Sequence, residues 1–170
     1  HIDFDTSPHL DHRVGDTLDA AFILSPQPDP SFHAVQLDHN KVYAITSKAL
    51  AAEIGPTPDR DVLSRQTFLI HTELPDSFIA WKQAIDLPDL EPAAIDHYDS
   101  GQLILEAAAQ GLGIAIMHDA HFDRAQDTRL ASLFDIEVKS PYSYWFVCKP
   151  HALDIRAVRI FHDWVVKTGL

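Results

Sequence analysis

The sequence predicts an α/β fold, and three observations support that prediction. Short apolar segments of strand length alternate along the chain with amphipathic segments of helical period. Clusters of Pro, Gly, Asp and Ser separate these segments, as expected of turns and helix ends. The 170 residues are 46% hydrophobic and 22% charged, which is ordinary for a globular chain in the single-domain size range. The alternation of strands with helices favours a largely parallel sheet.

The expected strands are runs that are either continuously apolar or alternate between apolar and polar residues. Residues 18–24 are apolar except for Asp19, which is typical of a mostly buried strand. Residues 2–5 alternate apolar and acidic side chains, which is typical of a half-buried strand. The full set of expected strands is 2–5, 18–24, 34–37, 42–45, 67–70, 93–98, 112–117, 133–138 and 142–149.

The expected helices are identified by their caps and by their apolar stripes. Ser47 precedes an apolar run that stops at Gly55, so it is expected to be the N-cap of a helix. Asp99 and Gln102 fit a capping box, with Asp99 as N-cap, and Gly111 stands where that helix would end. The full set of expected helices is 8–14, 47–54, a short helix entered at 57–60, 76–85, 100–110, 122–130 and 153–167.

Charge, hydropathy and cysteine content exclude several classes of protein. The 25 acidic and 13 basic residues give a net charge of −12, so this chain is not expected to bind nucleic acid, which requires clustered Lys and Arg. No apolar run approaches the roughly 18 residues of a membrane span, and the first residues do not resemble a signal peptide. The single cysteine, Cys148, is expected to be a buried strand residue in a reducing compartment. We therefore expect a cytoplasmic protein with no membrane partner.

The motifs of common catalytic and cofactor sites do not occur in the chain. It contains no Gly-x-Ser-x-Gly elbow, no phosphate-binding loop and no Gly-x-Gly-x-x-Gly. Two histidine pairs, His9 with His12 and His118 with His121, have a spacing that can chelate a metal on a helix, but no cysteine or His-Glu-x-x-His motif accompanies them. We expect no enzymatic activity, no cofactor and no specific metal. A small hydrolase or a metal-binding protein remains the least favoured alternative.

Several stretches together resemble the effector domain of LysR-type transcriptional regulators. The stretch Tyr98-Asp-Ser-Gly-Gln-Leu-Ile-Leu-Glu-Ala-Ala-Ala-Gln-Gly-Leu-Gly-Ile-Ala-Ile116 is similar to the family's signature: an aromatic residue, Asp, Ser, a helix with a Glu-Ala-Ala core, Gly-Leu-Gly and an apolar strand. The ending, Tyr144-Trp-Phe-Val-Cys-Lys-Pro150 followed by an amphipathic helix, is also similar. The strand at 67–70 ends in His71, as in the subgroup that includes glycine-cleavage and β-lactamase regulators. The resemblance covers nearly the whole chain in the right order.

This resemblance implies a type 2 periplasmic-binding-protein-like fold, in which two Rossmann-like subdomains are joined by two crossover strands. Subdomain I is expected at 1–41 plus 147–170, without the family's first β-α unit, and subdomain II at 42–146. The resemblance implies an N-terminally truncated effector-sensing domain that self-associates, while promoter DNA is bound only by a helix-turn-helix domain absent from this chain. A solute-binding protein of a transport system is the alternative, which the lack of a secretion signal disfavours.

The same resemblance implies that a small, anionic effector binds in a cleft between the subdomains. Polar residues that end strands or begin a helix are the candidates for contacting it, because backbone amides are unpaired there. A protonated His71 would supply a positive charge, and Asp99 would cap the helix that follows it. The alternative, that these are ordinary turn and cap residues, remains open. The candidate effector-binding residues are Thr6, Ser7, Ser25, His71, Thr72, Tyr98, Asp99 and Ser100.

Overall fold

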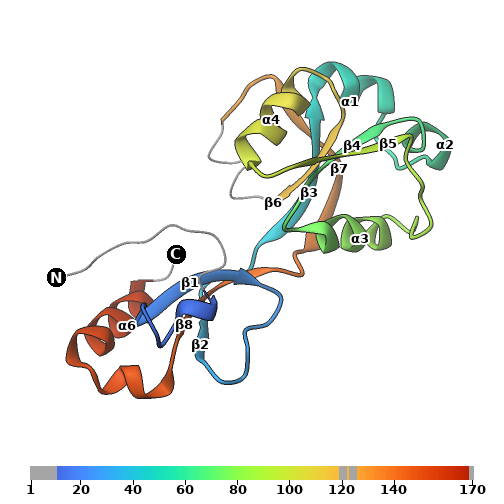
Figure 1. Cartoon of the computed structure of the whole chain (residues 1–170). Helices are drawn as coiled ribbons and strands as arrows, with labels where there is room; N and C mark the ends of the chain where they lie inside the picture. The colour runs from blue at the N-terminus through green and yellow to red at the C-terminus, as the bar shows by residue number, and fades with distance from the viewer. Residues whose placement is uncertain (1–10, 119–121, 123–125, 169–170) are drawn as a thin grey trace. The chain divides into compact units, whose positions relative to one another are not determined.

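The computed structural model describes residues 11–118, 122 and 126–168 (Figure 1). Two compact units divide the chain, and each has its own sheet and core. Unit 1 consists of residues 1–39 and 142–170, and unit 2 of residues 40–141. The expected strand at 2–5 lies outside the described residues.

Unit 2 is built on a five-stranded mixed sheet with the strand order β5-β4-β6-β3-β7. Strand β4 pairs in parallel with both β5 and β6, whereas β3 pairs antiparallel with both β6 and β7. The carboxyl ends of β4, β5 and β6 therefore lie at one edge of the sheet. The strands are β3 (Lys41–Ser47), β4 (Thr67–His71), β5 (Ala94–Tyr98), β6 (Ile114–His118) and β7 (Leu130–Lys139).

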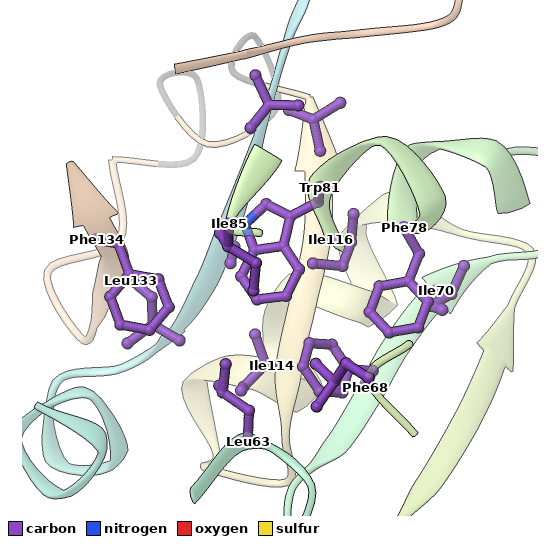
Figure 2. Close-up of a cluster of buried hydrophobic side chains, with 14 of the residues drawn as sticks. Leu63, Phe68, Ile70, Phe78, Trp81, Ile85, Ile114, Ile116, Leu133 and Phe134 are labelled. Atoms are coloured by element: carbon purple, nitrogen blue, oxygen red, sulfur yellow. The ribbon is translucent and has the colours of Figure 1, made fainter. Parts of the chain in front are cut away.

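Helices cover both faces of this sheet because successive residues of a buried strand point to opposite sides. Phe68 points to the face where it contacts the Trp81 ring, with the two centroids 5.6 Å apart (Figure 2). Leu69, one residue later, belongs to the cluster on the other face, with Ile104 and Ala108 of α4. The helices on the Trp81 face are α1 (Lys48–Ile54), α2 (Arg60–Leu63) and α3 (Pro75–Ala84), and α4 (Gly101–Ala109) covers the opposite face.

The connection between α4 and β6 contains two glycines. Gly111 has a φ of 76°, the left-handed conformation that ends a helix most easily with glycine. At Gly113 a Cβ atom would overlap the backbone carbonyl oxygen of Thr67 at the start of β4. The Gly-Leu-Gly sequence therefore allows β6 to enter the sheet directly beside β4.

Unit 1 has a three-stranded sheet in which β8 lies between β1 and β2 and pairs antiparallel with both. Phe146 and Cys148 of β8 are fully buried and belong to one cluster with Val158 and Val165 of the last helix. Val14, Ala21 and Val147 form the small core on the other face. The elements of unit 1 are η1 (Asp11–Arg13), β1 (Ala20–Ser25), β2 (His33–Gln36), β8 (Ser143–Cys148), η2 (Pro150–Asp154) and α6 (Arg156–Thr168).

The α/β class is confirmed, but the expectation of a largely parallel sheet is wrong. In the described part of the chain, the only strands that pair in parallel are β4 with β5 and β4 with β6, and the sheet of unit 1 is antiparallel throughout. A continuously apolar strand has the same sequence pattern whichever way its neighbours run, so the pattern placed these strands without giving their direction.

Three helix predictions also need correction. The expected helix at 8–14 is, within the described residues, only the 3₁₀ turn η1. The expected helix at 122–130 does not extend over residues 126–129, which lie outside any helix, and Leu130 already begins β7. The expected helix at 153–167 is divided at Ile155, because η2 ends at Asp154 and α6 begins at Arg156. The helix capped by Ser47 is confirmed, with bounds and cap as predicted.

Candidate functional site

The candidate site lies at the edge of the unit 2 sheet where three parallel strands end. His71, the last residue of β4, pairs in register with Tyr98, the last residue of β5. β6 ends at the same edge, because its Ile116 pairs with Ile70. Helices α3 and α4 begin within three or four residues of the ends of β4 and β5. This edge therefore combines strand carboxyl ends with two helix N-termini, which is where α/β sheets commonly hold anionic ligands.

Five of the eight predicted site residues come together at this edge. His71, Thr72, Tyr98, Asp99 and Ser100 all end β4 or β5 or follow directly after them. The other three lie elsewhere in the chain. Ser25 ends β1 in unit 1, and its hydroxyl donates a hydrogen bond of 3.0 Å to the backbone carbonyl oxygen of Gln27, as in an ordinary turn. Thr6 and Ser7 lie outside the described residues.

Thr72 links the ends of β4 and β5. Its backbone amide donates to the carbonyl oxygen of Tyr98 at 2.8 Å, and its hydroxyl donates to the same oxygen at 3.0 Å. A hydroxyl has one hydrogen to donate. The Thr72 hydroxyl is thus occupied as a donor, so it fixes the geometry of the edge instead of offering a hydrogen to an anion.

The ring of His71 accepts a hydrogen bond within its own turn. Its Nδ1 accepts a hydrogen bond of 3.2 Å from the backbone amide of Glu73. A ring nitrogen that accepts must be unprotonated, so in this arrangement the ring hydrogen is on Nε2. The predicted positive charge at His71 would require the loss of that hydrogen bond. In this geometry, His71 offers a neutral N–H donor.

The capping of helix α4 differs from the prediction, and the difference leaves more hydrogen-bond donors without a partner in the helix. The N-cap is Ser100, not Asp99, and the Ser100 side chain makes no capping hydrogen bond. The carbonyl oxygen of Ser100 accepts from the amide of Ile104 at 3.1 Å, which closes the first helical turn. The amides of the first turn, at residues 101–103, therefore lack helical partners, and the Ser100 hydroxyl is not used as a cap.

The two helix N-termini at this edge are not equivalent. Helix α3 begins with Pro75, which has no amide hydrogen, and carries Asp76 in its first turn. Helix α4 has no acidic residue in its first turn. Exposed carboxylates at Glu73, Asp76 and Asp99 nevertheless surround the edge. An anion here would therefore be held by short N–H and O–H hydrogen bonds at α4 and not by long-range attraction.

The sequence did not identify His118 as part of this edge. It is the last residue of β6, it is 4% exposed, and its Nε2 lies 2.8 Å from the hydroxyl oxygen of Ser140. The expected strand stopped one residue short of it, and the expected metal pair joined it to His121, which lies outside the described residues. Its burial and its contact with Ser140 give it a structural position beneath the edge.

A cluster of three charged side chains, centred on Arg129, lies away from this edge. Arg129 donates to Glu106 at 2.7 Å and to Asp127 at 2.7 Å, and these hydrogen bonds lower the pKa of both carboxyl groups. The same bonds raise the pKa of Arg129 above its ordinary value. This cluster links α4 to the start of β7. The described residues hold no group of three or more His, Cys, Asp or Glu side chains that could bind a metal.

Comparison with known proteins gives one family and many similar structures. The family model described as the LysR substrate binding domain matches residues 1–169. The effector domain of the transcriptional regulator AmpR of Pseudomonas aeruginosa is 26% identical, with a TM-score of 0.72 over 88% of this chain and 71% of that chain. The AmpR effector binding domain from Citrobacter freundii is 22% identical, with a TM-score of 0.67 over 86% and 72% of the two chains.

A third solved structure is more distant in sequence. The Synechocystis PCC6803 CcmR regulatory domain, solved in complex with 2-PG, is 15% identical, with a TM-score of 0.71 over 94% of this chain and 78% of that chain. No curated protein matches the chain.

Proposed function

Because the chain belongs to the family of LysR substrate-binding domains, the effector-sensing part of DNA-binding transcriptional regulators, we propose that it recognises a small anionic effector at the carboxyl edge of β4, β5 and β6. The observation that carries this proposal is the N-terminus of α4. No Ser100 side-chain hydrogen bond caps it, so its first-turn amides and the Ser100 hydroxyl are available to a ligand. His71 ends β4, the strand beside β5, and pairs in register with Tyr98 at the end of β5.

The chemistry of this edge suits a carboxylate or a phosphate. Helix N-termini bind such groups through unpaired amides and the positive end of the helix dipole. The amides of residues 101–103, the Ser100 hydroxyl and the Nε2–H of His71 are donors, and Thr72 and Tyr98 hold the strand ends that position them. Asp99 is an acidic neighbour of these donors, so short hydrogen bonds, and not long-range attraction, would hold the anionic group.

The rest of the proposed site comes from the other subdomain. We propose that 1–41 with 147–170 and 42–146 act as the two subdomains of the family's fold, and that Thr6, Ser7 and Ser25 contact the effector from the first of them. The two compact units of the chain support an organisation into two subdomains. Effector binding would then stabilise one arrangement of the subdomains over another, which is a population shift.

The proposal extends to the partners of the domain. Promoter DNA would be bound by a helix-turn-helix domain outside this chain, the location would be the cytoplasm, and the domain would have no catalytic activity of its own. The match to regulator effector domains favours this function over a transport-associated solute-binding protein. No helix within the described residues has both the length and the apolar character needed to cross a bilayer.

Self-association is also part of the proposal, and the outer face of α6 is the surface that supports it. Ile160 is 58% exposed and Trp164 is 59% exposed, so two large apolar side chains on one helix face water. Contiguous exposed apolar side chains often mark an interface. Light scattering should show a dimer at tens of micromolar, an order-of-magnitude choice based on typical interface affinities. It should show weaker association for Ile160→Glu, and a wild-type monomer would contradict this part.

The effector site is tested by calorimetric titration of the chain with inorganic phosphate and with succinate. Ser100→Ala and His71→Ala each remove one donor to a charged ligand, which costs about 1.5–3 kcal/mol, or roughly 10- to 150-fold in Kd. Ser47→Ala is the matched control, because Ser47 is also the N-cap residue of a helix but lies far from the proposed site. It ends β3, which runs antiparallel to β6, so it lies at the opposite edge of the sheet. If both site variants bind as tightly as the wild type, the site lies elsewhere.

A further inference from the structure

Two histidines of unit 1 meet where the last helix packs on the sheet. His33 is the first residue of β2, and His162 lies in α6, 129 residues later in the chain. Their Nε2 atoms are 3.0 Å apart and their ring centroids are 5.0 Å apart. Both side chains are half-buried, so the pair is accessible to small ions without being free to move in solvent.

Asp163 determines which atoms of His162 are available. The Nδ1 of His162 lies 3.0 Å from the Oδ1 of Asp163. A carboxylate only accepts hydrogen bonds, so Nδ1 carries the hydrogen that is donated to it. In neutral His162 the Nε2 atom therefore carries no hydrogen. Its lone pair accepts the hydrogen bond from the Nε2–H of His33.

The rings are also held in place by the core beneath them. The ring of His162 packs edge-on against fully buried Phe146 of β8, with the centroids 5.5 Å apart. The backbone of His33 pairs with Cys148 of the same strand. Because β8 is the central strand of the sheet, both histidines are anchored to the most buried part of unit 1.

We propose that His33 and His162 bind a divalent transition-metal cation through their Nε2 atoms, in place of the hydrogen that now lies between them. Metal–nitrogen bonds of about 2.0–2.1 Å across the 3.0 Å separation give an angle of about 90–97° at the metal. That angle suits the octahedral or square-planar geometry of Ni²⁺ and Cu²⁺. A tetrahedral Zn²⁺ site needs the two nitrogens about 0.3 Å further apart.

The hydrogen-bonding pattern around the pair resembles that of known histidine metal ligands. A metal-bound histidine usually donates its other ring N–H to a carboxylate, which orients the ring and strengthens it as a ligand. Asp163 holds this position for His162. On metal binding, the Nε2 hydrogen of His33 passes to solvent and a solvent hydrogen is taken up at its Nδ1, so both rings stay neutral. Water would complete the coordination, since the described residues contain no cluster of three ligands.

This site is distinct from the proposed effector site in both chemistry and location. The effector edge belongs to unit 2 and offers hydrogen-bond donors to an anion, whereas the histidine pair belongs to unit 1 and offers lone pairs to a cation. A bound metal would join β2 to α6. The inference does not depend on the proposed function.

The first test is a calorimetric titration of the 170-residue chain with Ni²⁺ at pH 7.5. His33→Gln and His162→Gln should each abolish the tightest binding event. Asp163→Ala should weaken that event about 10- to 100-fold, because it removes the carboxylate that orients His162. His97→Gln, on exposed β5, is the matched control and should bind Ni²⁺ like the wild type. Mg²⁺, which prefers oxygen ligands, should give no binding heat.

The second test uses only the wild-type chain, so it does not depend on how the variants fold. Histidine-ring ¹⁵N NMR with substoichiometric paramagnetic Ni²⁺ should broaden the Nε2 resonances of His33 and His162 before those of the other histidines. Lowering the pH should release the metal, because imidazole must be unprotonated to bind it. The proposal fails if Ni²⁺ does not bind, if His33→Gln and His162→Gln bind it as the wild type does, or if Ni²⁺ first broadens the resonances of other histidines.

Discussion

Two serines begin helices in unit 2, and their hydroxyls have different roles. The hydroxyl oxygen of Ser47 accepts a hydrogen bond of 3.2 Å from the amide of Leu50, and the residue is 8% exposed. The hydroxyl of Ser100 makes no such bond to α4. Ser47 therefore stabilises its helix, whereas Ser100 is available to a ligand.

Replacing each serine by alanine should separate these roles. Ser47→Ala should lower the free energy of unfolding by about 1 kcal/mol, the usual cost of losing an N-cap. Ser100→Ala should change the free energy of unfolding by only a few tenths of a kcal/mol, because no capping hydrogen bond is lost. Urea denaturation followed by tryptophan fluorescence measures both. Equal destabilisation by the two substitutions would show that Ser100 does cap α4.

The carboxyl groups around Arg129 predict a pH effect with a definite sign. Arg129 lowers the pKa of Glu106 and Asp127 below their ordinary values of 4.5 and 3.8. A carboxyl whose pKa is lower in the folded state stabilises the fold above its unfolded pKa, and this contribution disappears as the pH falls through the folded pKa. The stabilising effect of Arg129 should therefore be present at pH 6 and shrink below about pH 4.

Arg129→Met tests this effect directly. Carboxyl ¹³C NMR titration should show the pKa of Glu106 and Asp127 rising toward their ordinary values in the variant. Asp29 is an internal control, because its lowered pKa comes from hydrogen bonds of Ser31 in unit 1 and should not move. Unchanged titration of Glu106 and Asp127 would mean that the Arg129 cluster does not form in solution.

Sequence patterns placed some of the proposed effector-binding residues at the same edge of the sheet because the signals that mark them are local. Ser100 and His71 could be predicted, since each follows a recognisable strand and strand ends are where ligands gather. The cap was assigned to Asp99 instead of Ser100, because both are good N-cap residues and differ by one position. The pairing of His33 with His162 could not be predicted, because neither periodicity nor spacing relates a strand to a helix 129 residues away.

At the scale of elements, the link between α4 and β6 is the least tolerant of change. Gly113 lies against the backbone of Thr67, and its own carbonyl oxygen accepts a buried hydrogen bond of 2.8 Å from the Thr46 hydroxyl. A backbone carbonyl cannot move aside as a flexible side chain can. Three strands, β3, β4 and β6, therefore depend on the missing side chain at this position.

Gly113→Ala should accordingly destabilise the protein by about 1–3 kcal/mol, the usual cost of overpacking. Gly55→Ala is the comparison. A Cβ at Gly55 meets no atom within 4 Å, so any loss there comes only from its φ of 87°. Thermal unfolding monitored by circular dichroism compares the two. A Gly113→Ala protein as stable as the wild type would contradict the close approach of β6 to β4.

Element positions followed from the sequence more reliably than strand directions did. Ser47 and Gly55 marked both ends of α1, because a cap and a left-handed glycine are local signals. The antiparallel pairing of β8 with β1 and β2 was not predictable, since their apolar sequences fit either direction.

At the scale of the whole molecule, the chain carries separate cores in its two units. Trp81 is 1% exposed and lies in the largest cluster of unit 2, with Phe68, Phe78 and Phe134 around it (Figure 2). The core of unit 1 is centred on Phe146. The described members of each core come from one unit alone, so damage to one core should be felt mainly in its own unit.

Trp81→Ala should cost about 3–5 kcal/mol, as large-to-small core substitutions do. Amide hydrogen exchange should show lost protection in β4 and β6 of unit 2 and retained protection in β8 of unit 1. Phe146→Ala should give the reverse pattern. Equal loss of protection in both units after either substitution would mean that they fold as one cooperative body.

The most direct test of the central claim is a ¹H–¹⁵N NMR titration of the chain with inorganic phosphate and with succinate. If the domain senses its effector through the edge at α4, the largest shifts should occur at the amides of Gly101, Gln102 and Leu103 and at the ring of His71, and Ser100→Ala should reduce them. Shifts that leave these groups unchanged, or that gather in unit 1 alone, would contradict the assignment of the effector site to the carboxyl edge of β4, β5 and β6.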